Sequence, residues 1–77
     1  MEELINRLTA IQKEQLEVYS HDTAKATIIK DWRTVAEIEI RMDAYLTALM
    51  HIGQFSYLQI QRIQAYYLTE DRSNNDE

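Results

Sequence analysis

The chain contains no cysteine, no proline and only one glycine, Gly53. Without cysteine, neither disulfide bonds nor a thiolate zinc site can stabilise the fold, so hydrophobic burial has to do so. Without proline, and with one glycine, very little in the sequence interrupts a helix. Apolar residues also recur at spacings of three and four rather than two. The sequence therefore predicts an all-α protein.

The length of the chain, 77 residues, suits one small helical domain, expected over residues 1–69. A domain of this size buries only about 60% of its unfolded surface, so extra burial from self-association or from a partner is expected. A homo-oligomer is predicted, with a dimer favoured. The net charge is −5, and residues 70–77, with four carboxylates and one arginine, carry −3 of it and are expected to form a disordered acidic tail. Neither a signal sequence nor a membrane span is recognisable, which favours a cytoplasmic location.

Three helices are expected, at residues 2–19, 23–52 and 57–69. Ser20 and Asp22 belong to the only cluster of capping residues before the second apolar run, so they predict a tight hairpin turn there. One uninterrupted helix over residues 2–52 is the alternative, because no residue in the cluster forces a turn.

The start of the third helix has the strongest local signal in the sequence. Gly53 suits the left-handed conformation that ends a helix. Ser56 and Gln59 have the spacing of a capping box, and Phe55 with Ile60 has the spacing of a hydrophobic staple. The expected fold is a helical hairpin with a long central helix and a third, shorter helix, assembled into an oligomeric helical bundle.

Two carboxylates, Glu39 and Asp43, lie one turn apart on the otherwise apolar face of the second helix, and Glu39 is expected to be at least partly buried there. A helical di-metal site would need Glu-x-x-His motifs, but Ala48 stands three residues before His51. We therefore expect no metal site, cofactor or catalytic residue. The favoured interpretation is a structural ion pair between Glu39 and Arg7, within one chain or across a dimer.

Two glutamates earlier in the chain bear on a second enzyme class. Residues 14–17, with Glu14 and Glu17, resemble the first half of the Glu-x-x-Glu and Glu-x-x-Asp pair that holds magnesium in all-α nucleotide pyrophosphatases. The second half does not match, because Glu39 and Asp43 are separated by one residue too many. Catalysis is therefore not expected.

Charge almost disappears in the second half of the chain. Residues 44–69 include one formally charged side chain, Arg62, whereas residues 1–43 include fifteen. Interface cores are depleted in charge and enriched in aromatic residues and arginine. The predicted partner-binding residues are Tyr45, Phe55, Tyr57, Leu58, Arg62, Tyr66 and Tyr67.

Residues 20–25 (Ser-His-Asp-Thr-Ala-Lys), followed by Ile28, Ile29, Lys30 and Trp32, resemble the start of the second helix in the NblA family. The likeness covers about residues 20–46. It implies a small helical-hairpin adaptor, since members of that family bring phycobilisomes to a protease. The sequence departs from the family at residues 51–53, which lack the family's tryptophan.

These observations predict a non-enzymatic protein–protein interaction module, such as an adaptor, inhibitor or regulatory subunit. The alternatives are a structural homo-oligomeric bundle, an NblA-like proteolysis adaptor and a weak nucleic-acid binder. Nucleic acid is the least suitable partner, because the glutamine- and tyrosine-rich segment lacks the basic track that phosphate binding requires.

Overall fold

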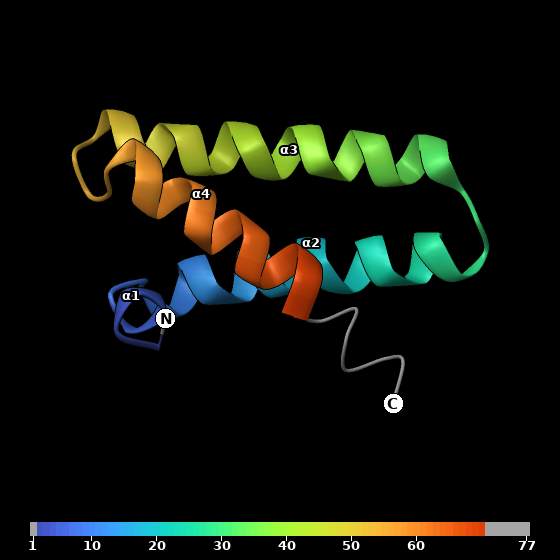
Figure 1. Ribbon diagram of the computed structural model, residues 1–77, viewed down its shortest axis with the longest axis horizontal. Helices are drawn as coiled ribbons and strands as arrows, with labels where there is room; N and C mark the ends of the chain where they lie inside the picture. Colours follow the sequence, from blue (N-terminus) through green and yellow to red (C-terminus); the bar gives the residue numbers. More distant parts are fainter. Residues whose placement is uncertain (1, 71–77) are drawn as a thin grey trace.

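The computed structural model describes residues 2–70, with side chains described for residues 3–68. The helical segments, in order, are α1 (Glu2–Asn6), α2 (Ala10–Ile28), α3 (Trp32–His51), α4 (Tyr57–Ala65) and a π-helical segment, η1 (Tyr66–Glu70). No strand occurs within residues 2–70, which confirms the all-α class. As Figure 1 shows, α2 and α3 run antiparallel, and α4 crosses them obliquely at one end.

The predicted first helix, residues 2–19, is interrupted at Thr9. Thr9 has an extended backbone and caps α2: its hydroxyl accepts from the amide of Gln12 (3.1 Å), and the Gln12 side chain accepts from the amide of Thr9 (2.9 Å). The short preceding helix α1 lets Leu8 enter the core, where its side chain is buried. The spacing of Thr9 and Gln12 is that of a capping box, so the sequence did contain this signal.

The predicted hairpin exists, but the predicted turn at residues 20–22 is wrong. Ser20 lies inside α2, which continues to Ile28, and the chain reverses about ten residues later, at residues 29–31. The long single helix is thereby excluded, and the predicted second helix at 23–52 is shortened to Trp32–His51. The NblA-like stretch begins inside α2 and continues through the turn into α3, so it does not mark the start of a helix. Burial explains the difference, because Ser20 is 5% exposed and packs inside the fold instead of capping.

The two turns that flank α3 have the same hydrogen-bond pattern. At the α2–α3 turn, the amide of Asp31 donates to Ala26 (2.8 Å) and that of Lys30 to Thr27 (3.0 Å). At the α3–α4 turn, the amide of Gln54 donates to Leu49 (3.1 Å) and that of Gly53 to Met50 (3.0 Å). Both are Schellman motifs, whose central residue takes a positive φ: +82° at Gly53, as predicted, and +59° at Lys30.

Asp31 then begins α3 as its N-cap. Its carboxylate accepts from the amide (3.2 Å) and the hydroxyl (2.7 Å) of Thr34. These two hydrogen bonds lower the pKa of the Asp31 carboxyl.

The start of α4 agrees with the prediction. The hydroxyl of Ser56 accepts from the amide of Gln59 (3.3 Å), and the Gln59 side chain accepts from the amide of Ser56 (2.9 Å). The predicted helix at 57–69 is α-helical only to Ala65 and continues as η1. Most of the predicted acidic tail, residues 71–77, lies outside the described residues.

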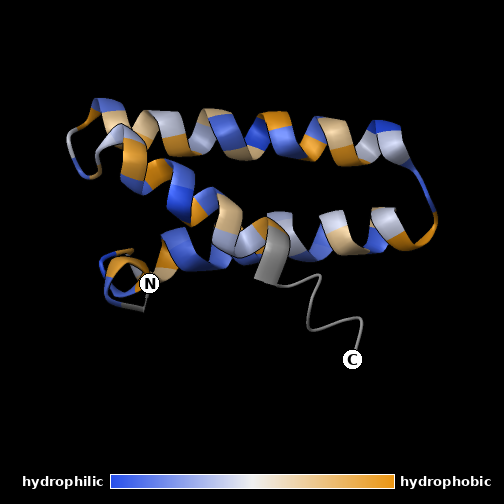
Figure 2. Cartoon of the chain, in the orientation of Figure 1, coloured by the Kyte–Doolittle hydropathy of each residue, from blue (hydrophilic) through white to orange (hydrophobic). Residues whose placement is uncertain are grey.

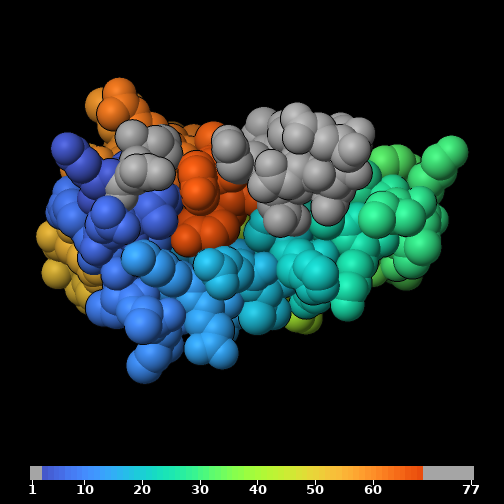
Figure 3. All heavy atoms as spheres, turned by 90° about the horizontal axis from the view of Figure 1, so that it is seen from below, coloured from blue at the N-terminus to red at the C-terminus, as the bar shows by residue number. Residues whose placement is uncertain are grey.

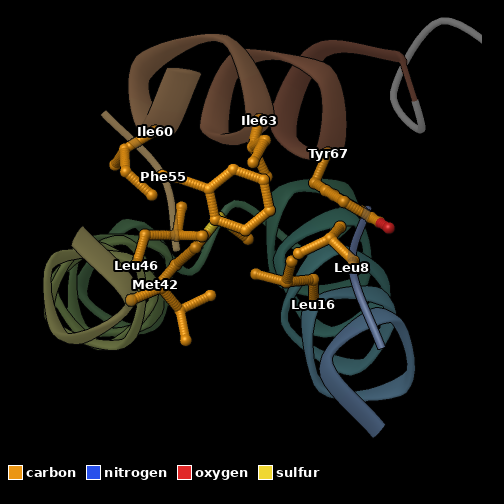
Figure 4. Packing of buried hydrophobic residues seen from close by; sticks show 9 residues of the cluster. Leu8, Leu16, Met42, Leu46, Phe55, Ile60, Ile63 and Tyr67 are labelled. Carbon is orange, nitrogen blue, oxygen red and sulfur yellow. The ribbon is translucent and has the colours of Figure 1, made fainter. Parts of the chain in front are cut away.

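The core lies at one end of the hairpin, where α4 and η1 cover the first half of α2 and the second half of α3 (Figure 4). Its buried members are Leu8, Leu16, Met42, Leu46, Leu49, Phe55, Ile60, Ile63 and Tyr67. Toward the α2–α3 turn the buried side chains become small, as at Thr23, Ala24 and Ala26, with Ile38 the one large exception. The hydrophobic layer is therefore thick at one end of the hairpin and thin at the other.

None of the described helices is both long enough and apolar enough to span a bilayer. Figure 2 shows the corresponding hydropathy pattern, in which apolar and polar residues alternate along every helix.

Candidate interaction surface

The seven predicted partner-binding residues divide into three groups by burial. Phe55 and Tyr67 are 3% and 6% exposed and belong to the core, so the structure does not offer them to a partner. Tyr45 and Tyr66 are half-buried against that core. The exposed members are Tyr57, Leu58 and Arg62.

The less exposed tyrosines make their contacts within the fold. The ring of Tyr66 meets that of Tyr67 edge-on, with centroids 5.2 Å apart, and the hydroxyl of Ser20 donates to the carbonyl oxygen of Tyr67. Burial raises the pKa of Tyr67 to about 12, and the negative charge of Glu17 contributes to the shift. Tyr45 packs edge-on against Tyr19 of α2 at 6.2 Å. Composition alone predicted that these aromatic residues bind a partner, whereas in the structure they have contacts within the fold.

The outward side of α4 differs from an ordinary solvent-facing helix surface. Ile60 and Ile63 point into the core, which leaves an exposed face, here called the α4 face, made of Tyr57, Leu58, Gln61, Arg62 and Ala65. Tyr57 is 62% exposed and Leu58 is 71% exposed. Arg62 is the one charged side chain of the face, whereas solvent-facing helix surfaces are normally rich in charge.

Ile52 extends the apolar surface onto the α3–α4 turn, where it is 72% exposed. Three apolar side chains of substantial size, those of Ile52, Tyr57 and Leu58, are thus exposed within seven residues of chain.

A polar cluster fixes the α3–α4 turn to the start of α2. The guanidinium of Arg7 donates to the carbonyl oxygen of Gln54 (2.8 Å) and lies 4.8 Å from the ring centroid of Phe55. The side-chain amides of Gln12 and Gln54 also donate to each other, at 2.9 and 2.8 Å. Sequence reasoning missed both glutamines, since only the fold brings residues 42 positions apart together. The cluster positions the turn from which the α4 face begins.

The predicted ion pair between Arg7 and Glu39 is not formed within one chain, because the structure does not bring the two residues together. Arg7 lies at the Gln54 end of α3, and Glu39 is thirteen residues before the C-cap Ile52, or about 20 Å along the helix. The later hairpin turn is the cause, since it places Glu39 level with the middle of α2 rather than with its start. Glu39 is half-buried, as expected, and Asp43 is exposed.

Acidic side chains do not form a metal-binding arrangement within residues 2–70, where no group of three or more histidines or carboxylates is suitably placed. Glu14 and Glu17 both lie exposed on α2.

A second exposed apolar group lies at the α2–α3 turn and was not predicted. Ile28 and Ile29 are each 73% exposed and Trp32 is 60% exposed. Beside them a groove of about 430 Å³ runs between α2 and α3. Figure 3 shows α4, in orange, over one end of the molecule and the turn, in green, at the other.

No family model matches this sequence, and comparison with curated proteins and with solved structures finds no match either.

Proposed function

We propose that this chain is a non-enzymatic protein–protein interaction module that binds its partner through the α4 face. The observation that carries the proposal is the exposure of Tyr57 and Leu58, at 62% and 71%, on a helix face with one charge. Covering such side chains costs little desolvation free energy, because few of them are charged.

The composition of the face also resembles the centre of an interface. Tyrosine and arginine are frequent hot spots, and charge is depleted at interface cores. The face combines Tyr57 and Arg62 with an apolar residue, Leu58, one helical turn before the arginine. A matching partner would present an apolar patch flanked by a carboxylate that accepts from Arg62.

The α3–α4 turn supports binding by pre-organisation. The hydrogen bonds between Gln12 and Gln54, with that from Arg7, hold the turn before any partner arrives. A surface that is already ordered loses less conformational entropy on binding, so more of the contact energy appears as affinity.

The experiment compares affinity capture from the native host by the unaltered chain, by Leu58→Glu and by a control, Ala44→Glu. Both positions are exposed and receive the same charge, but Ala44 belongs to α3 and is not part of the α4 face. Proteins retained by the unaltered chain and by Ala44→Glu should be lost with Leu58→Glu, with an affinity decrease of at least about tenfold for a hot-spot residue. A set of captured proteins that is the same for all three chains would refute the proposal.

A further inference from the structure

The turn end of the hairpin combines exposed apolar residues with a missing third layer. α4 and η1 cover the opposite end, and Figure 1 shows α2 and α3 extending beyond them toward the turn. Three of the five residues from 28 to 32 are large and apolar: Ile28, Ile29 and Trp32, exposed by 73%, 73% and 60%. Turns between helices are normally polar, whereas this turn exposes large apolar side chains. The turn end therefore resembles a two-helix half of a four-helix bundle whose apolar side is uncovered.

The groove beside the turn has an apolar base and a charged rim. Ala26 and Ile38 are 4% and 7% exposed and line it together with Ile29. The rim carries both signs of charge, supplied by the acidic Asp22, Asp31 and Glu37 and the basic Lys25 and Arg41. Small residues such as Ala26 let another helix approach closely.

We propose that a second copy of this chain packs on this groove, with the two turn ends related by a two-fold axis. In such an interface residue i of one copy meets residue j of the other, and j meets i. A rim with both signs is complementary to itself in this arrangement, because Lys25 and Arg41 can face the acidic residues of the partner copy. A partner of predominantly one charge would instead meet repulsion from part of the rim.

The size of the turn end agrees with a dimer interface. A standard interface takes about 800 Å² from each partner, or about 15% of the 5385 Å² accessible surface of this chain. Residues 22–41 are twenty of the 69 described residues, so one side of this segment has an area of the required order. Pairing supplies two further helices and converts the exposed end of each hairpin into a four-helix arrangement.

The matched pair Ile29→Lys and Ile52→Lys tests the proposal. Each isoleucine is the C-cap of a long helix, precedes a residue with positive φ and is exposed by more than 70%, at 73% and 72%. The two positions lie at different turns, since Ile29 lines the groove at the α2–α3 turn and Ile52 begins the α3–α4 turn. A lysine at the end of a helix is also compatible with the helix dipole, so both variants should fold.

Light scattering after size-exclusion chromatography should give twice the chain mass of 9.2 kDa, about 18 kDa, for the unaltered protein and for Ile52→Lys, and 9.2 kDa for Ile29→Lys. Trp32 is the one tryptophan of the chain, so its emission should move to shorter wavelength as the unaltered protein dimerises on concentration. The proposal would be overturned if the unaltered protein were monomeric, if Ile52→Lys dissociated the dimer or if Ile29→Lys remained a dimer. A tryptophan emission that stays constant on concentration would also overturn it.

The proposal is independent of the partner bound at the α4 face. Partner capture that fails with Leu58→Glu while the mass remains near twice 9.2 kDa separates the two surfaces. Conversely, dissociation by Leu58→Glu with no effect of Ile29→Lys would show that the α4 face is the site of self-association.

Discussion

Replacing Ile63 by alanine tests whether α4 packs on the hairpin as described. Ile63 is fully buried at the centre of the core, between residues of α2, α3 and the α3–α4 turn (Figure 4). The substitution removes three carbon atoms, worth about 2.4 kcal/mol at about 0.8 kcal/mol each, and the remaining cavity adds to this loss. Alanine gains a few tenths of a kcal/mol in helix propensity. The expected loss in the free energy of unfolding is therefore about 3 kcal/mol.

That loss is a large fraction of the total stability. At about 0.05–0.15 kcal/mol per residue, 77 residues have an unfolding free energy of roughly 4–12 kcal/mol. Urea denaturation followed by circular dichroism at 222 nm should show a much lower midpoint with an unchanged slope.

Leu58→Ala is the matched control on the same helix. Leu58 is 71% exposed, so its truncation should change the free energy of unfolding by less than about 0.5 kcal/mol. If Ile63→Ala and Leu58→Ala had equal effects, the assignment of the inner and outer sides of α4 would be refuted, and with it the α4 face.

Two further predictions concern backbone strain and pH. Lys30→Gly should stabilise the protein by about 0.5 kcal/mol, because glycine removes the left-handed strain at φ +59° but loses more entropy on folding. Gly53→Ala should destabilise it by about 1 kcal/mol through backbone strain and not through a clash, since a Cβ there meets no atom within 4 Å. Thermal melting compares the two variants, and stabilisation by both substitutions would contradict the reasoning. Because burial raises the pKa of Tyr67 from 10.0 to about 12, folding favours the neutral phenol, so its stabilising contribution is complete below pH 10 and is lost as the pH rises to 12. Urea titrations across this range should show a smaller fall in the free energy of unfolding for Tyr67→Phe than for the unaltered protein, and identical falls would show that Tyr67 is not the responsible group.

The sequence predicted the helical class and the second turn but misplaced the first turn, and the two turns explain why. Both are Schellman motifs with the same hydrogen bonds. The α3–α4 turn has glycine at the left-handed position and is recognisable, whereas the α2–α3 turn has Lys30 there and is not. The polar residues at 20–22 offered an alternative that tertiary packing does not use, since Ser20 is buried against η1.

The candidate site could be predicted only in outline. Charge depletion directed attention to residues 44–69, but composition does not distinguish the inner from the outer side of a helix that is apolar on both. Phe55 and Tyr67 therefore seemed equivalent to Tyr57, although the first two are core residues. The Arg7–Gln54 and Gln12–Gln54 contacts depend on the α3–α4 turn meeting the start of α2, which no local pattern encodes.

The position of the first turn also determines how many separate apolar groups the hairpin exposes. A turn at residue 20 would have left the last third of the helix expected at residues 23–52 uncovered by the first helix, with the third helix about long enough to cover it. With the turn at residues 29–31, α4 and η1 together are only about 20 Å long and cross the hairpin obliquely, whereas α3 is about 30 Å long, so one end is covered and the other is not. The apolar residues at 28–32 and those at 52–58 then lie at opposite ends of α3. At this separation the proposed self-association at the α2–α3 turn and the proposed partner binding at the α4 face need not compete.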